Sequence, residues 1–361
     1  MNSFDAAMDP NEKVTLALAF LAYEESSQNL RKYLASLESL IGKYALVWGP
    51  SFHYNLVHKT DSMAFIVRSM DEPASFYVVI RGTTPLTLTD WIFHDLLVQS
   101  MVSWDLVPWE GVLPPPQPLA GSPAVSLASN NALAILVNVL TDNGITIGAF
   151  LQNQVKRATT PVTIYFTGHS LGGAMAPALA LYLHDHWPAG QAKPLWKVYG
   201  FAGPTAGNGP FASHSNRFLG ADCKIYQNPF DVATHVWDLR SMEKLPSLYA
   251  PLKMPNILLK ILQKIAIPAI KDKNYTQLEV KQPEIPSRII INQFIDDYLP
   301  EMIYQHLLPY FAELIRLCPE TGREQLIQLI DSWEIIKTFK EIKPFVNCPG
   351  REFHYFLELL S

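Results

Sequence analysis

The sequence predicts an α/β fold with a mostly parallel central sheet flanked by helices. Between residues 162 and 227, short runs of β-branched and aromatic residues alternate with a helical pattern, which is typical of parallel strands joined by crossover helices. Of the 361 residues, 48% are hydrophobic and only 17% are charged, so the chain can bury a large core. We therefore expect one enlarged α/β domain over residues 1–361.

The first third of the chain is predicted to be helical and then to enter the sheet. Apolar residues recur at helical spacing from Asn11 to Leu40. Three short strands are predicted next, at Tyr44–Trp48, Ala64–Arg68 and Phe76–Arg81, because each run is bounded by turn-forming residues. Six prolines between residues 104 and 123 exclude a regular helix or a central strand, so this stretch is predicted to be irregular.

The rest of the sheet is predicted from residue 129 onwards. Helical patterns cover Ser129–Thr141 and Phe150–Lys156. The next predicted elements are strands at Val162–Thr167, Trp196–Phe201 and Lys224–Gln227 and a helix at Leu171–His184. Residues 241–300 break this alternation with prolines, lysines and clusters of Ile and Leu, and helices are predicted again from Ile289 to the end.

Charge and cysteine content exclude several classes of function. The formal net charge is -5, with 28 Lys and Arg against 33 Asp and Glu, so the chain has no basic footprint for a nucleic-acid backbone. Cys223, Cys318 and Cys348 are too few and too scattered for a disulfide framework or a zinc site. Whether Cys318 and Cys348 form one disulfide is left open. We expect no metal site and no nucleic-acid partner.

We predict neither a secretion signal nor a membrane-spanning segment in this sequence. Met1–Pro10 carries acidic residues and no basic region, so no signal peptide is predicted, and the compartment is left open: the cytoplasm, export by another route, or a leader missing from this sequence. A transmembrane helix needs roughly 18 or more apolar residues. The nearest run, Ile257–Ile270, is interrupted by Lys260 and Lys264. The sequence predicts a protein that is soluble or lies on a membrane surface.

The most informative motif is Gly-His-Ser-Leu-Gly at residues 168–172, between a predicted strand and a predicted helix. Glycines two positions on either side of a serine fit a tight strand-to-helix turn that exposes the serine hydroxyl. The helix N-terminus adds a partial positive charge and free N–H groups where an oxyanion forms. This context favours Ser170 as a nucleophile over a structural glycine-rich turn, with the backbone N–H of Leu171 as an oxyanion donor.

A serine nucleophile needs a histidine base and a carboxylate that orients it, and in α/β-hydrolases these follow in the order Ser, Asp, His. Asp231 is the best carboxylate candidate because it follows a predicted strand, and Asp238 is the runner-up. His235 lies too few residues after Asp231 to leave room for the intervening helix and strand. We favour His306 as the base and keep His354 as the alternative.

A second oxyanion donor is expected where the strand Phe76–Ile80 ends. The next residues, Arg81-Gly82-Thr83-Thr84, place a backbone N–H and a hydroxyl at the carboxyl end of a strand, where α/β sheets build their sites. We expect Arg81 to brace this loop through a carboxylate. The alternative is a solvent-facing β-turn with a capping threonine.

These motifs together resemble those of class 3 lipases of the α/β-hydrolase superfamily. The matching stretches are Val79-Ile80-Arg81-Gly82-Thr83 with Asp90-Trp91 and Asp95, Gly168–Ala174, Tyr199–Pro204 with Gly207-Asn208, and Asn228–Val232. The resemblance implies Thr83 as an oxyanion donor, Ser170 as the nucleophile and Asp231 as the acid. Bacterial members often place the catalytic histidine in Gln-His with a Tyr four residues later, which fits His306 and Tyr310. The family's His-x-Gly-Phe segment is missing here.

The resemblance also implies a lid after the oxyanion strand, over Thr84–Ser103. We therefore predict that residues 84–118 form the lid and the proline-rich excursion and that residues 241–300 form a helical cap insertion lining an acyl pocket. The cap segment Ile257–Lys271 has a wide apolar face and a narrow lysine stripe, so it is either buried at the rim of the site or in contact with a lipid interface. The residues expected in the substrate pocket or lid are Thr84, His169, Trp91 and Phe93.

The predicted function is a serine-dependent lipase or carboxylesterase that hydrolyses acylglycerol esters through an acyl-enzyme. The expected partner is a lipid or ester substrate, and no metal or organic cofactor is required. A phospholipase A1 would use the same catalytic residues and is the main alternative. A non-catalytic lipid-binding protein on a hydrolase scaffold is the remaining alternative.

Overall fold

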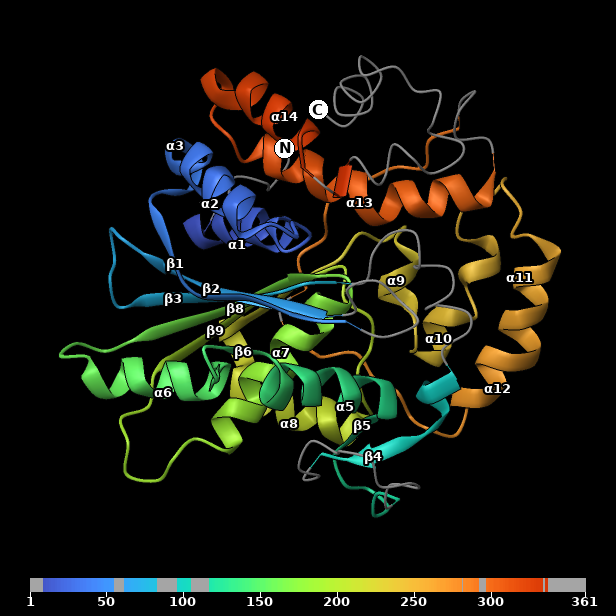
Figure 1. Ribbon diagram of the computed structural model, residues 1–361. Helices are drawn as coiled ribbons and strands as arrows, with labels where there is room; N and C mark the ends of the chain where they lie inside the picture. Colours follow the sequence, from blue (N-terminus) through green and yellow to red (C-terminus); the bar gives the residue numbers. More distant parts are fainter. Residues whose placement is uncertain are drawn as a thin grey trace.

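A six-stranded mixed sheet lies at the centre of the described part of the chain, which in this computed structural model comprises residues 9–54, 62–82, 96–104, 117–280, 282–291, 297–333 and 335–336 (Figure 1). In order across the sheet, the strands are β1 (Tyr44–His53), β2 (Ser62–Ser69), β3 (Ser75–Ile80), β8 (Thr163–His169), β9 (Leu195–Phe201) and β10 (Cys223–Tyr226). β2 pairs antiparallel with both β1 and β3, and β3, β8, β9 and β10 are parallel. The predicted α/β class with a mostly parallel sheet is confirmed.

Helices cover both faces of this sheet (Figure 1). One face carries α1 (Pro10–Leu21) and α13 (Tyr298–Arg316); the other carries α5 (Leu127–Ala134), α6 (Ile147–Arg157), α7 (Leu171–Asp185) and α8 (Gly209–Leu219). Side chains alternate between the faces along a strand. In β2, Met63 and Phe65 join the apolar cluster that contains α1 and α13, whereas Ala64 and Ile66 join the cluster that contains α7.

Shorter elements complete the fold. They are α2 (Ser27–Ser36), α3 (Glu38–Ile41), the paired β4 (Met101–Ser103) and β5 (Ala124–Ser126), the π-helical turn η3 (Ile135–Val139), the paired β6 (Thr141–Asp142) and β7 (Ile145–Thr146), α9 (Val232–His235) and α14 (Arg323–Asp331). The helix predicted from Ile289 instead begins at Tyr298, where the Asp297 carboxylate caps the amide of Tyr298. Residues 289–291 are not helical, and the amide of Ile290 donates to the side chain of Glu301 at 3.2 Å.

A third apolar cluster lies beside α9 and is built largely from short helices (Figure 1). These are α10 (Leu239–Met242), the 3-10 turn η5 (Leu245–Ser247), α11 (Asn256–Ile261), the π-helical turn η6 (Leu262–Ala266) and α12 (Ile267–Ile270). The 3-10 turn η2 (Leu96–Gln99) packs against α12, and the hydroxyl of Tyr275 donates to the carbonyl of Val98 at 2.6 Å. The described end of the predicted lid therefore contacts the helices of the predicted cap.

Candidate active site

Ser170 occupies a strained turn between β8 and α7. Its φ of 60° and ψ of -127° lie where a residue with a Cβ is rarely found, and such a conformation persists only when its surroundings enforce it. The amide of Ser170 donates to the carbonyl of Phe201 at 2.9 Å, and its own carbonyl accepts from the amide of Gly173 at 2.9 Å. The first amides of α7, including that of Leu171, have no partner within the helix and are available to an anion.

Glycines allow α7 to lie directly against the sheet behind Ser170. A Cβ on Gly172 would lie 2.3 Å from the carbonyl oxygen of Ile80, and one on Gly173 would lie 2.2 Å from that of Phe201. At the end of β3, a Cβ on Gly82 would lie 2.9 Å from the Cβ of Ser170. The loop in which the second oxyanion donor is expected therefore starts in contact with the serine turn.

Asp231 and His306 form a buried pair. Asp231 follows β10 and caps α9, accepting from the amide of Ala233 at 2.9 Å. The Nδ1 of His306 lies 2.9 and 3.0 Å from the two carboxylate oxygens, and the side chains are 3% and 0% exposed. Because an ionised carboxylate only accepts, Nδ1 carries the proton, and Nε2 of the neutral ring is left free to take one.

Tyr310 joins this pair from the next turn of α13. Its hydroxyl donates to Oδ2 of Asp231 at 3.1 Å and accepts from the amide of Asn228 at 3.0 Å. Asp231 thus accepts from a histidine, a tyrosine and a backbone amide, all donors that stabilise its ionised form. The carboxylate is therefore held in one position by three donors.

The side chain of His169 joins α13 to the segment that follows α1. Its Nε2 donates to the carbonyl of His306 at 2.9 Å, so its Nδ1 accepts from the hydroxyl of Tyr23, also at 2.9 Å. Burial, followed by the nearby His306, holds the pKa of His169 well below its usual value, which keeps the ring neutral. The ring is fully buried, and its expected place in the substrate pocket or lid stays a prediction. The hydrogen bond from its Nε2 holds the backbone of His306 against the residue that precedes Ser170.

The structure thus brings the elements of Ser170, Asp231 and His306 together. The rings of His169 and His306 lie 4.7 Å apart. The hydroxyl of Ser170 is buried and makes no hydrogen bond to any described residue.

Asp238, the alternative carboxylate, caps α10 by accepting from the amide of Ser241 at 2.9 Å. The predicted residues that lie outside the described residues are Thr83, Thr84, Trp91, Phe93, Cys348 and His354.

Arg81 braces the end of β3, as expected. Both terminal nitrogens of its guanidinium lie 3.2 Å from a carboxylate oxygen of Glu25, and its side chain is 4% exposed. The guanidinium carbon also lies 5.9 Å from the ring centre of Tyr23. Arg81 therefore ties the loop beside Ser170 to the segment that follows α1.

A buried polar chain behind Asp231 was not predicted from the sequence. The side-chain amide of Asn228 donates to the side-chain oxygen of Gln305 at 2.8 Å, and Gln305 donates to Glu301 at 2.7 Å. Burial raises the pKa of Glu301 to about 7, although its hydrogen bonds from Gln305 and Ile290 act in the opposite direction. The spacing of four residues between Glu301 and Gln305 on a helix was the available signal.

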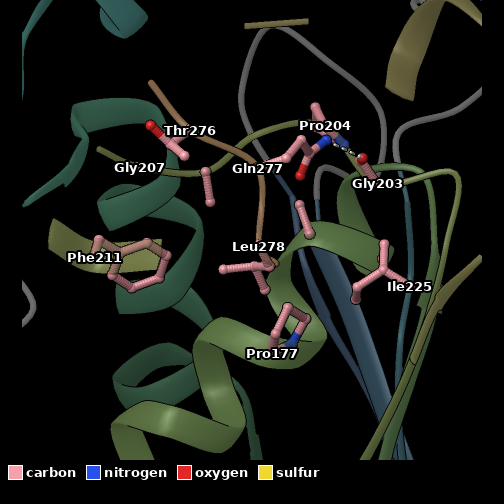
Figure 2. A pocket seen from close by; sticks show the side chains of 12 residues that line it. Pro177, Gly203, Pro204, Gly207, Phe211, Ile225, Thr276, Gln277 and Leu278 are labelled. Atoms are coloured by element: carbon pink, nitrogen blue, oxygen red, sulfur yellow. Dashed lines mark hydrogen bonds between the residues drawn. The ribbon is translucent and has the colours of Figure 1, made fainter. Parts of the chain in front are cut away.

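A small cavity lies behind the first turns of α7 (Figure 2). Its volume of about 20 Å³ suits one water molecule and is too small for an acyl chain. It is bordered by Pro177, Phe211 and Leu278, and the side-chain amide of Gln277 donates across it to the carbonyl of Gly203 at 3.5 Å (Figure 2). We assign this cavity a packing role.

Within the described residues there is neither a group of metal-binding side chains nor a membrane-spanning helix. In these ranges, no three or more His, Cys, Asp or Glu side chains are grouped so that they could hold a metal ion. None of the described helices is long and apolar enough to cross a membrane.

Comparison with known proteins identifies the fold and gives a family match over part of the chain. The family model for lipase (class 3) matches residues 77–236. The crystal structure of M37 lipase superposes with a TM-score of 0.73 at 24% identity, covering 90% of this chain and 98% of that one. Lipase II from Rhizopus niveus gives a TM-score of 0.43 at 20% identity, with 64% and 76% of the two chains covered. A sequence comparison with curated proteins gives no match.

The family match includes β3, the serine turn, β9, β10 and Asp231. These are the elements that the structure gathers around Ser170, and the M37 lipase superposition shows the same overall fold. The sheet and its flanking helices have the α/β-hydrolase fold, and the match over residues 77–236 identifies this part of the chain with the class 3 lipases, which are carboxylic ester hydrolases.

Proposed function

We propose that the chain hydrolyses acylglycerol esters through an acyl-enzyme on Ser170. The observation that carries this proposal is the buried Asp231–His306 pair, with 2.9 Å between Nδ1 and the carboxylate, held beside the serine turn by His169. A histidine oriented by a carboxylate beside a strained serine is the arrangement that activates a hydroxyl for acyl transfer.

The proposed reaction has two halves. The Oγ of Ser170 attacks the ester carbonyl while Nε2 of His306 takes its proton, and the ester C–O bond then breaks as His306 returns that proton to the leaving alcohol. Water attacks the acyl-enzyme with His306 again as the base, which releases the fatty acid and restores the serine. The hydrogen bond between Ser170 and His306 is expected to form as substrate binds, since catalytic contacts often tighten at that stage.

Leu171 and Thr83 are the proposed oxyanion donors. The amide of Leu171 lies at the N-terminus of α7, where the helix dipole favours developing negative charge. Thr83 follows Gly82, which contacts the serine turn. Donors of this kind are worth about 3 kcal/mol of transition-state stabilisation each.

Residues 84–118 and 241–300 are proposed as the lid and the cap over this site. The contact between η2 and α12 supports the assignment, as does the burial of Val98 and Met101 in one cluster with Leu258 and Leu262. Deletion of residues 250–275 is expected to abolish hydrolysis of long-chain esters and to spare short ones. Equal loss on both in a folded protein would contradict the proposed cap.

The decisive test of the catalytic proposal is Ser170→Ala, with Ser36→Ala as a matched control at an exposed position. Ser170→Ala should lose hydrolysis of p-nitrophenyl esters and labelling by a fluorophosphonate, while Ser36→Ala should keep both. Labelling that persists in Ser170→Ala would identify a different nucleophile.

The substrate class needs a separate assay. We expect the parent protein to release fatty acid faster from a triacylglycerol emulsion than from phosphatidylcholine vesicles at equal ester concentration. The reverse order, with release from the sn-1 position, would replace the acylglycerol proposal with a phospholipase A1, which uses the same catalytic residues.

A further inference from the structure

The helical segment 256–271 is anchored to the protein by one face only. Leu258, Leu262, Ala266 and Ile270 follow one another at intervals of four residues, and all are at most 8% exposed. They pack in the third apolar cluster together with Tyr249 and other side chains. Positions four apart share one side of a helix, so the segment has a distinct outer face.

That outer face exposes large apolar side chains. Ile257 is 66% exposed and Ile265 is 46% exposed, and Ile261, which lies between them, is half-buried. Isolated exposed apolar residues are common on proteins. Here, however, Ile257 and Ile265 lie two turns apart on one helical segment, with Ile261, which also packs against the third apolar cluster, between them. This is the pattern of a face that contacts something apolar.

Lysines accompany the isoleucines on this face. Lys260, Lys264 and Lys271 are exposed, and none of them forms an ion pair with any carboxylate of the described residues. Lysine stems can lie along an apolar surface while the ammonium group reaches a polar layer. An apolar stripe flanked by lysines is therefore suited to the boundary between acyl chains and headgroups.

The charge of this region is opposite to that of the rest of the chain. Residues 239–273 contain seven Lys or Arg and two acidic residues, a net charge of +5 within a chain of net charge -5, which leaves -10 for the remainder. The seven basic residues are Arg240, Lys244, Lys253, Lys260, Lys264, Lys271 and Lys273, and the two acids are Glu243 and Asp272. An anionic surface would attract this side of the molecule and repel the others.

We propose that the outer face of segment 256–271 is a docking surface for a lipid bilayer with anionic headgroups. The lysines meet the headgroups, and Ile257 and Ile265 enter the outer edge of the acyl layer. A second copy of the chain is a poorer partner, because it would bring the same positive face against this one. Docking goes beyond the proposed ester hydrolysis, since it requires no active serine.

The helical segment that carries the docking face contacts the described end of the proposed lid, which follows β3 in the sequence. α12 packs against η2, and Tyr275, just after α12, donates to the carbonyl of Val98. A bilayer held against α11 and α12 would therefore lie close to the described end of the proposed lid. Docking at this face would bring the proposed lid close to the bilayer that supplies the lipid substrate.

The test is co-sedimentation with vesicles, using the Ser170→Ala protein so that no lipid is hydrolysed. Vesicles of pure phosphatidylcholine are compared with vesicles containing one quarter phosphatidylglycerol. We expect clear binding to the anionic vesicles, weaker binding to the neutral ones, and a decrease as salt rises. Equal binding to both, or no binding to the anionic vesicles, would overturn the proposal.

Two sets of variants locate the surface. Replacement of Lys260, Lys264 and Lys271 by Gln should lower the partition coefficient on anionic vesicles by about 100-fold, because each basic residue contributes about a fivefold factor. Replacement of Ile257 and Ile265 by Ser should lower it by about tenfold or more. The charge-matched control replaces the exposed Lys32, Lys156 and Lys193 by Gln, and the apolar control replaces the exposed Leu119 and Leu195 by Ser.

The controls should bind as tightly as the parent protein. If they weaken binding as much as the cap variants do, the docking surface lies elsewhere. Sedimentation velocity completes the test: self-association that the Ile257 and Ile265 changes abolish, without vesicle binding, would assign the face to a second copy and overturn the proposal. In the Ser170-containing protein, the cap variants should retain hydrolysis of soluble p-nitrophenyl butyrate, so failed docking is distinguishable from a failed catalytic proposal.

Discussion

Replacing Glu301 by glutamine is expected to remove part of the pH dependence of the protein's stability. Glu301 is fully buried on α13, one turn before Gln305. Its Oε1 accepts from Gln305 at 2.7 Å and from the amide of Ile290 at 3.2 Å, whereas its Oε2 is buried and has no partner among the described residues. A glutamine can keep both accepted hydrogen bonds without carrying a charge.

The magnitude follows from the difference in pKa between the folded and unfolded states. Burial raises the pKa of Glu301 from 4.5 to about 7. Between these values the folded protein keeps a proton that the unfolded chain releases, so stability is full below pH 4.5 and is lost as the pH rises through 7. For this single carboxyl, the free energy of unfolding should fall by roughly 2.5 kcal/mol between pH 5 and pH 8. Burial also raises the pKa of Tyr249 and Tyr304, so these neighbouring phenols stay neutral in this range.

The assay is urea unfolding of the parent, Glu301→Gln and Glu38→Gln at pH 5 and pH 8. Other titrating groups contribute equally to all three proteins, so the comparison isolates the replaced carboxyl. Glu301→Gln should lose roughly 2.5 kcal/mol less than the parent on going to pH 8. Glu38 is exposed, so Glu38→Gln should follow the parent. Equal losses in the parent and in Glu301→Gln would refute the reasoning.

Three further predictions concern the framework of the site. Tyr310→Phe removes a hydrogen bond to Asp231 and should cost about 2 kcal/mol of unfolding free energy and about tenfold in kcat, measured by urea titration and ester hydrolysis. His169→Leu removes the donor to the carbonyl of His306 and should lower kcat at least tenfold with KM unchanged, whereas His169→Gln should restore most of it; equal rates in the two would contradict a positioning role. Gly173→Ala places a Cβ against the backbone of β9 and should lower the melting temperature by about 5 °C or more, so an unchanged value would contradict that close approach.

The sheet could be predicted from the sequence because its signals are local. All six strands were predicted within a few residues, since runs such as Phe76–Arg81 and Val162–Thr167 combine β-branched or aromatic residues with flanking turn formers. The serine turn was predicted for the same reason. The start of α13 was predicted too early: residues 289–291 are not helical, and the amide of Ile290 pairs with the side chain of Glu301, a contact that a local pattern does not contain.

The framework of the site depends on contacts that no local pattern encodes. Tyr23 and His169 are 146 residues apart, and His169 and His306 are 137 apart, yet each pair shares a hydrogen bond. A buried tyrosine near the end of a helix is far more often a packing residue, so Tyr23 gave no signal of its own. Asp231 and His306 could be selected only because the resemblance and the order of the motifs limited the choice.

The hydrogen bonds from Tyr23 through His169 to His306 also constrain when the site can form. α1 and α13 lie near opposite ends of the chain and share one apolar cluster, with the rings of Phe20 and Phe311 stacked at 3.8 Å. A ribosome-bound chain lacking α13 would contain Ser170 and Asp231 but neither His306, the proposed base, nor the partner that buries α1. The chain is therefore expected to hydrolyse esters only after translation has passed residue 316, the end of α13. Before that point the growing chain should be inactive, because its fold is not yet complete.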